Sequence, residues 1–440
     1  MYQHLITLQD SRDAVICLSF SPQAKFIAAA GYGGVTVWDL ESFDPIPVPN
    51  NIYNPRNPDN VYSACAWLHF EQADRYFLIV GSQEGTVSIM QLEANDEAFH
   101  TTVRVVPEPS GFQVLSIDVY HTEIEIGKLA RIAVATADNR TTVYTLSSSG
   151  VFREIFSATV EDFSLIAARF CKKTADIYVF ELNGGTIMRL DYKTGDVKSN
   201  QKYGPDPMGT VCIDDSSNFF VACTGADFQM LRLDTIEHIQ TFSGPDPVVR
   251  FPKVATFSED GAVLIGGTDR GHAMVFDVQS GAKVQPLKYA KGGLVQPVAA
   301  CTSKKGFLAA IAGSTMETSA EVMIYQKNHL PPSTPKSNDN TKASLYRSFM
   351  NRGSIQFIFV MLGMSLMLNG LYSLALTYTP VVQSMLEAKS ATSGSQRTIK
   401  VHTDFAPTYN RRDTNSPNSI SDAYTIIESR YAPEHLNALD

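Results

Sequence analysis

The sequence predicts an all-β fold, a seven-bladed β-propeller, followed by a single transmembrane α-helix and a disordered tail. Residues 1–327 contain short apolar runs separated by clusters of Gly, Asp, Asn, Ser and Pro, a pattern typical of strands joined by turns. In this region a hairpin-like unit occurs seven times, at a spacing close to the length of a propeller blade. The chain then contains an uncharged apolar segment, which is long enough to cross a bilayer.

The repeated unit is clearest from Phe20 to Leu40, where an apolar strand, a glycine hairpin and a strand ending in Trp38-Asp39 follow one another. The steps between the ends of successive units are 52, 54, 44, 43, 45 and 48 residues. Seven four-stranded blades with loops of variable length account for these steps. The units end at Leu40, Leu92, Leu146, Leu190, Leu233, Val278 and Gln326.

A strand-like segment from His4 to Leu8 precedes the first unit and has no unit of its own, whereas the seventh unit lacks a fourth strand after Gln326. Pairing the two would complete the last blade and leave no long unpaired strand edge. We therefore expect the beginning of the chain to close the ring.

The run FSPQAKFIAAAG…VTVWDL and the segment from Ala255 to Val284 resemble the WD-repeat (WD40) pattern. This resemblance implies a ring of four-stranded blades, in which each repeat supplies three strands of one blade and one of the next. The family's Gly-His pair is absent before the first strands and Trp-Asp occurs once. The repeats are therefore divergent, and the family's His/Ser/Asp/Trp hydrogen-bond network is expected to be missing from most blades.

The apolar segment is densest from Ile355 to Leu376, IQFIFVMLGMSLMLNGLYSLAL, which is 22 residues. A helix of this length extends about 33 Å and crosses a hydrocarbon core of about 30 Å. We expect a transmembrane helix over residues 354–378 that contacts the bilayer through this segment. The alternative is a helix buried in a protein core or in the groove of a partner. Ser365 and Asn369 are its candidate polar contacts with another helix, although Asn369 could also snorkel or bond to backbone.

Positive charge near the helix predicts its orientation. The polar linker of residues 328–353 carries four basic residues, whereas two lie within about twenty residues on the other side. This bias predicts a cytosolic propeller and a low-complexity tail over 379–440 that is luminal or extracellular. We expect an endomembrane location, first of all the endoplasmic reticulum. The basic residues are Lys336, Lys342, Arg347 and Arg352 before the helix, and Lys389 and Arg397 after it.

The composition disfavours several classes of protein. The formal net charge is −9, whereas a nucleic-acid binder usually presents a basic surface. No two of the six cysteines stand at CxxC spacing, so we expect neither a zinc site nor a disulfide framework but buried, reduced thiols. The N-terminus has no basic start and no long apolar run, so no cleavable signal peptide is expected.

No catalytic pattern stands out. The nine histidines are scattered, and HExxH, GxSxG and P-loop motifs are absent. We therefore expect no catalytic residue, no cofactor, no metal and no small-molecule substrate. Several hairpins carry acidic or amide residues, which suit tight turns or else form a polar ring that docks a partner. The resemblance implies that partners bind the face that holds these hairpins. The candidate partner-binding residues are Glu84, Asp138, Asn139, Asp227, Asp269 and Arg270.

These observations favour a membrane-tethered scaffold that binds other proteins through its propeller and catalyses no reaction itself. The alternative is a propeller-type guanine-nucleotide exchange factor for a small GTPase in vesicle coat assembly at the endoplasmic reticulum, because the layout resembles that of such a factor. The glycine-rich loop that such a factor uses is not found, since Ala28 to Gly34 is too short. A hydrolytic propeller enzyme would need a clustered acid/base or metal set, and none is visible.

Overall fold

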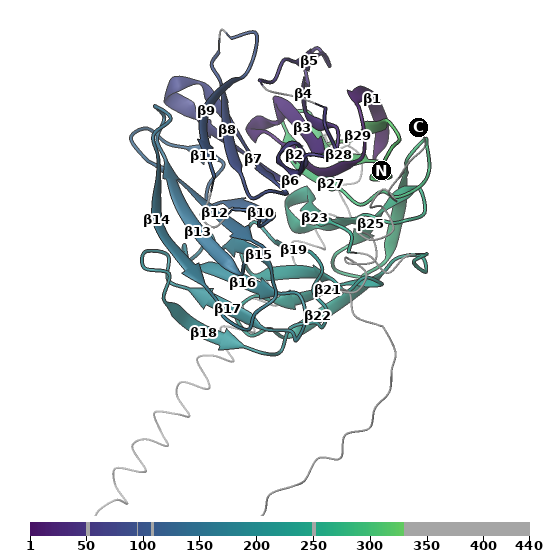
Figure 1. The fold of residues 1–440 in the computed structure, drawn as a ribbon. Coiled ribbons are helices and arrows are strands. Elements are labelled where there is room, and N and C mark those ends of the chain that lie inside the picture. Colours follow the sequence, from purple (N-terminus) through teal and green to yellow (C-terminus); the bar gives the residue numbers. More distant parts are fainter. Residues whose placement is uncertain (50–52, 95, 107–109, 249–251, 330–440) are drawn as a thin grey trace, which may run out of the picture. The chain divides into compact units, whose positions relative to one another are not determined.

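The computed structural model describes residues 1–49, 53–94, 96–106, 110–248 and 252–329. These residues form seven sheets, which succeed one another around a ring (Figure 1). The predicted all-β, seven-bladed propeller is confirmed. Four one-turn 3₁₀ helices lie in its loops: η1 (Pro22–Ala24), η2 (Pro58–Asn60), η3 (Glu71–Ala73) and η4 (Glu259–Gly261).

Blades 1 to 4 follow in chain order, each beginning with its innermost strand. Blade 1 contains β2 (Val15–Phe20), β3 (Phe26–Gly31), β4 (Gly34–Asp39) and β5 (Pro45–Ile46). Blade 2 contains β6 (Tyr62–Phe70), β7 (Arg75–Ser82), β8 (Val87–Leu92) and β9 (His100–Val105). Blade 3 contains β10 (Val114–Val119), β12 (Ala130–Thr136), β13 (Arg140–Leu146) and β14 (Phe152–Thr159). Blade 4 contains β15 (Leu165–Phe170), β16 (Ile177–Glu181), β17 (Ile187–Leu190) and β18 (Val197–Gln201).

Blades 5 to 7 complete the ring. Blade 5 contains β19 (Val211–Ile213), β20 (Phe219–Cys223), β21 (Asp227–Arg232) and β22 (His238–Ser243). Blade 6 contains β23 (Ala255–Ser258), β24 (Val263–Gly266), β25 (His272–Asp277) and β26 (Lys283–Lys288). Blade 7 contains β27 (Val298–Ser303), β28 (Gly306–Ala312) and β29 (Ala320–Asn328), and its outermost strand is β1 (Gln3–Ser11).

The first strand closes the ring, as predicted. β1 pairs antiparallel with β29, with Ile6 opposite Ile324 and Leu8 opposite Val322. The strand is longer than the expected His4–Leu8 segment because the pairing continues, through irregularities, to Ser11. The two ends of the propeller thus belong to one sheet, and unfolding of blade 7 must release both.

The hydrophobic core lies between neighbouring sheets. Phe26 of blade 1 stacks on Trp67 of blade 2 with ring centroids 5.9 Å apart, and both side chains belong to one buried cluster. Trp38 of blade 1 is buried in another cluster with Ile324 of blade 7. Alternate residues of each strand face opposite neighbours, so every blade is held from both sides by apolar packing.

The innermost strands bond across blades through side chains. Ser116 of β10 accepts a hydrogen bond from the Ala168 N–H at 3.0 Å, and Asp118 accepts one from the Phe170 N–H at 2.7 Å. Each innermost strand is the edge of its sheet, so its outward backbone groups need partners from elsewhere. Burial raises the pKa of Asp118, although the charge of Arg169 and the N–H of Phe170 oppose this shift.

One strand departs from the four-stranded pattern. β11 (Glu123–Ile124) lies between β10 and β12 in sequence but pairs parallel with the end of β6 in blade 2, through His69 and Phe70. Ile124 is 5% exposed and packs in the cluster that joins blades 2 and 3. This insertion therefore links two blades on the side opposite the inter-blade connections.

In the part of the chain that the structure describes, every helix is too short to span a bilayer. The predicted transmembrane segment Ile355–Leu376, with Ser365 and Asn369, lies outside the described residues, as do the linker beyond His329 and the tail. The membrane anchor and the tail therefore stay predictions.

Candidate interaction face

Two kinds of loop meet at one end of every blade: the hairpin between the second and third strands, and the connection that enters the next blade. Antiparallel order brings both to the same end of the sheet. Main-chain hydrogen bonds join them, for example from the Gly111 N–H to the Glu84 carbonyl (3.0 Å) and from the Gly271 N–H to the Gly293 carbonyl (2.9 Å). We call this end of the ring the connection face. Its described inter-blade loops are 12–14, 47–49, 53–61, 106, 110–113, 160–164, 202–210, 244–248, 252–254 and 289–297.

All six candidate residues lie on this face, but three of them serve the turns themselves. The Glu84 carbonyl accepts the bond from Gly111. Asp138 pairs with Arg140 at 3.1 Å and accepts a bond from the Thr136 hydroxyl at 2.5 Å. Asn139 adopts a positive φ of 60°, and its side-chain oxygen accepts the Leu165 N–H at 3.1 Å. Asn139 thus ties the hairpin of blade 3 to the first strand of blade 4, which is a structural role.

The other three differ in what they present to solvent. Asp227 begins β21, where its backbone bonds with Thr224. Arg270 is exposed, and its guanidinium donates twice to the Asp246 carbonyl, at 2.8 and 3.1 Å. The Asp269 side chain is only 2% exposed and lies 3.8 Å from the Lys253 ammonium. Partner binding by these residues stays a prediction. The Asp269 side chain is buried under the connection face, where it pairs with Lys253.

The Lys253–Asp269 pair is a buried ion pair beneath the connection face. The Lys253 ammonium also donates to the Gly225 carbonyl at 3.4 Å, and its own carbonyl accepts a bond from Thr210 at 2.7 Å. Burial lowers the pKa of Lys253, and the Asp269 charge opposes this shift. The pair links the connection before blade 6 to the hairpin of that blade.

Exposed aromatic side chains gather on the connection face and were not predicted. Tyr203 is 78% exposed, Tyr53 45% and Phe112 37%, and all three lie in connections between blades. Val106 and Val248, at 52% and 66%, lie in two further stretches of these connections. Among the described residues, no other aromatic side chain has a large exposed fraction. A sequence signal existed, since these residues stand in Gly- and Pro-rich loops instead of alternating strands.

A groove of about 640 Å³ opens at the rim of this face between blades 7 and 1. Its walls combine apolar residues, such as Val48, with charged ones. Lys291 spans it with an ion pair to Glu321 at 3.3 Å and a bond to the Ser319 carbonyl at 2.8 Å. The main lining segments are 9–12, 35–36, 45–48 and 319–321.

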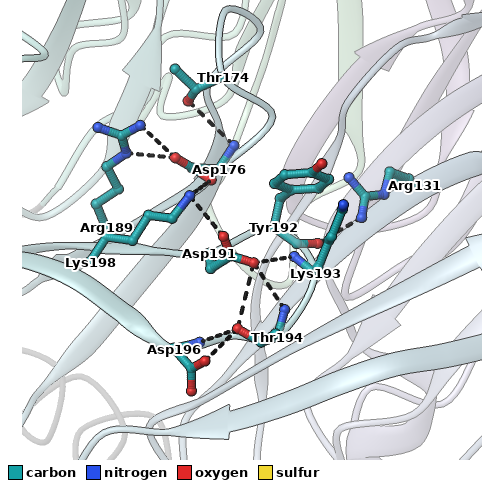
Figure 2. A network of polar contacts seen from close by, with 10 residues as sticks. All are labelled: Arg131, Thr174, Asp176, Arg189, Asp191, Tyr192, Lys193, Thr194, Asp196 and Lys198. Atoms are coloured by element: carbon teal, nitrogen blue, oxygen red, sulfur yellow. Dashed lines mark hydrogen bonds and ion pairs between the residues drawn. The ribbon is translucent and has the colours of Figure 1, made fainter.

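A polar network lies at the opposite end of blade 4 (Figure 2). Asp176, whose side chain is 1% exposed, pairs with Arg189 at 2.6 Å and Lys198 at 2.8 Å. Lys198 also contacts Asp191 at 2.8 Å. The acidic and basic side chains pair with one another, so this network stabilises the outer strands β17 and β18 of the blade. In the described part of the chain, no group of three or more His, Cys, Asp or Glu could hold a metal ion.

Comparison with known families agrees with this architecture. The family model for the WD domain, G-beta repeat, matches residues 2–39. This range runs from β1 to the end of β4, which is one strand of blade 7 and three strands of blade 1. The match and the seven blades together support a WD40 β-propeller, a fold that typically binds other proteins. No curated protein matches the chain.

Proposed function

We propose that this protein is a membrane-tethered scaffold that binds other proteins through the connection face of its propeller and catalyses no reaction itself. The observation that carries the proposal is the position of its exposed aromatic residues. Tyr203, Tyr53 and Phe112 all lie on that face. Aromatic anchors contribute most of the binding energy at many protein interfaces, and leaving them in water is otherwise unfavourable.

The face also offers a rigid support for such anchors. Each connection is bonded to a hairpin, as for Gly111 with Glu84, and the Arg270 guanidinium holds the connection that contains Asp246. A partner that packs on a preorganised surface loses less conformational entropy on binding. The polar hairpin residues would surround the aromatic anchors as the rim of the interface.

The tether is the second part of the proposal. Its support is the uncharged segment Ile355–Leu376 and the basic linker before it, which favour a single-pass protein with a cytosolic propeller at an endomembrane such as the endoplasmic reticulum. The last described residue, His329, follows β29 and lies at the end of blade 7 opposite the connection face.

Proximity labelling with the full chain tests the scaffold function. We expect a set of labelled proteins in the wild type that falls at least about tenfold in a Tyr203→Ala/Phe112→Ala variant, which corresponds to about 1.4 kcal/mol. The matched control is Val197→Ala/Val284→Ala, because these side chains are 56% and 47% exposed on outermost strands. Equal labelling by both variants would contradict the proposed face.

Alkaline carbonate extraction of membranes tests the tether. We expect the full chain to stay in the pellet, and a variant with Met364 and Leu368 changed to Lys to be released, because two charges near the centre of a span oppose insertion. Release of the wild type into the supernatant would remove the tether from the proposal and leave the binding face unaffected.

A further inference from the structure

Two cysteine thiols face each other across the boundary between blades 1 and 2. Cys17 lies on β2 and Cys65 on β6, the innermost strands of these blades. The two strands run in the same direction, because each starts from a connection. The Trp67 indole on β6 donates to the Ser19 carbonyl on β2 at 2.9 Å, an offset of 48 residues. Cys65 and Cys17 are also 48 residues apart, and each lies two residues before Trp67 or Ser19 on its strand. The same alignment of the two strands therefore places the two cysteines side by side.

The two thiols lie near each other at this position. The Cys17 thiol donates to the Ala30 carbonyl at 3.7 Å, and the nearby Cys65 thiol is the largest cause of the raised pKa of Cys17. Both residues pack against the same buried cluster, which contains Trp67 and Phe26, and both remain partly exposed. The surrounding core therefore holds the two thiols in place.

We propose that Cys17 and Cys65 are a disulfide site, which links blade 1 to blade 2 when the protein meets a low-molecular-weight disulfide oxidant. The sheets of these two blades share no main-chain ladder between β2 and β6. They are joined by side-chain packing and by the Trp67 bond. A covalent bond at this point would therefore fasten a boundary that the fold otherwise leaves noncovalent.

The reaction is a double thiol–disulfide exchange. One cysteine thiolate attacks a sulfur atom of the small disulfide, forms a mixed disulfide and releases one small thiolate, which takes up the proton that the cysteine lost. The second cysteine thiolate then attacks the protein sulfur of the mixed disulfide and releases the second small thiol. Two protein thiols are oxidised, and one small disulfide is reduced to two thiols.

The surroundings of Cys17 predict a pH dependence for this exchange. The Cys65 contact and burial raise the pKa of Cys17 well above its ordinary value. Because the thiolate is the reactive form, the cross-link forms slowly at neutral pH and faster as the pH rises.

Other cysteines of the same chain serve as matched controls. Cys212 and Cys301 also lie partly exposed on innermost strands, β19 and β27, but these belong to blades 5 and 7, which are not neighbours. Burial raises the pKa of each to about 12. Cys212 has no cysteine on the neighbouring innermost strands β15 and β23. Cys301 lies next to β2 but packs in the cluster between blades 7 and 1, whereas Cys17 and Cys65 pack in the cluster between blades 1 and 2.

The experiment uses the full chain and oxidised glutathione at pH 8.5. Free thiols are counted after denaturation, and peptide mapping by mass spectrometry identifies the linked residues. We expect two of the six thiols to disappear, a Cys17–Cys65 linked peptide, and a rise of the melting temperature that dithiothreitol reverses. Cys17→Ser and Cys65→Ser should each abolish the link, whereas Cys212→Ser and Cys301→Ser should leave it unchanged.

Three results would overturn the proposal: an unchanged thiol count, glutathione bound at Cys17 or Cys65 without a link, or a link that involves Cys212 or Cys301. Cys17→Ala and Cys65→Ala provide a second pair of variants in case serine disturbs the packing. Near-UV circular dichroism of each variant before oxidation establishes that a missing link reflects the missing thiol and not a lost fold.

Discussion

Asp13 accepts a hydrogen bond from the main-chain N–H of Glu317 at 2.7 Å, across 304 residues of sequence. The same carboxylate accepts the Ala14 N–H at 2.7 Å and the Tyr53 hydroxyl at 3.0 Å. Asp13 is 3% exposed and stands between β1 and β2. One side chain therefore joins the hairpin of blade 7, the start of blade 1 and the connection to blade 2 at the point where the ring closes.

Replacing this carboxylate should weaken the closure. Asp13→Ala removes the acceptor of the buried Ala14 N–H and of the part-buried Glu317 N–H, and an unsatisfied buried donor costs about 1–3 kcal/mol. Tyr53→Phe is the control, because it removes a single hydroxyl from an exposed ring and should cost about 0.5–1.5 kcal/mol or less. Urea denaturation measures both. A loss in Asp13→Ala no larger than that in Tyr53→Phe would contradict the assigned role.

The Asp13 carboxylate also changes the ionisation of Tyr53, which can be followed by absorbance. Its hydrogen bond raises the pKa of Tyr53, because ionising the phenol would place a second negative charge beside the first. In Asp13→Asn we therefore expect one tyrosine to ionise at lower pH than in the wild type, measured by ultraviolet absorbance at high pH. An unchanged titration would indicate that Tyr53 and Asp13 are not in contact in solution.

The strand β1 should carry much of the stability of the ring. Leu8→Ala is expected to cost about 2–5 kcal/mol, because Leu8 is 3% exposed. Leu5→Ala, at 43% exposure on the same strand, should cost under about 1 kcal/mol. Removal of residues 1–12 should lower the melting temperature further, since β29 then loses its whole partner strand. A chain that starts at Asp13 and melts like the full chain would refute closure by β1.

The seven blades and the closing strand could be predicted because they depend on local signals. Apolar runs around Gly33 or Asn139 mark strand–turn–strand units, and His4–Leu8 is a strand-like run with no unit of its own. β11 could not be predicted in this way. A strand of two residues is too short for alternation to appear, and its partner β6 lies in the preceding blade.

The candidate face could be predicted only in outline. Turn chemistry locates Asp138 and Asn139 on a hairpin, but the bonds that occupy them, to Arg140 and Leu165, depend on neighbouring blades. Asp269 looks like any surface turn residue until Lys253 packs against it. Tyr203 is exposed because no neighbouring loop in the described part of the chain packs over it. The hydrophobic periodicity of the sequence carries no information about such packing between loops.

The buried Lys253–Asp269 pair should be costly to break from one side. Lys253→Met leaves the Asp269 carboxylate, 2% exposed, without this cation, and such a change costs about 3–5 kcal/mol. The double variant Lys253→Met/Asp269→Leu should recover part of that loss, because it removes the buried charge as well. Thermal denaturation of the two single variants and the double variant gives the coupling energy. Simple additivity would show that the two charges do not interact.

The blade 4 network predicts a loss of stability in acid. Burial by itself raises the pKa of Asp176, but hydrogen bonds from Lys198 and Arg189 outweigh it and lower the pKa below its ordinary value. A carboxyl whose pKa is lower in the folded state stabilises the protein above its unfolded pKa of about 3.9. That contribution disappears as the pH falls through the folded pKa, so the affected window lies below about pH 4.

Asp176→Asn tests this sign. At pH 7 it should cost about 1–3 kcal/mol, because hydrogen bonds to a charged group are lost. The difference from the wild type should shrink as the pH falls below about 4, where the wild-type carboxyl also becomes neutral. Asp215→Asn is the control, because this side chain is 94% exposed in its pair with Lys172, and surface pairs contribute little. A difference between wild type and Asp176→Asn that stays constant from pH 7 to pH 3 would show that the network does not act through the charge of Asp176.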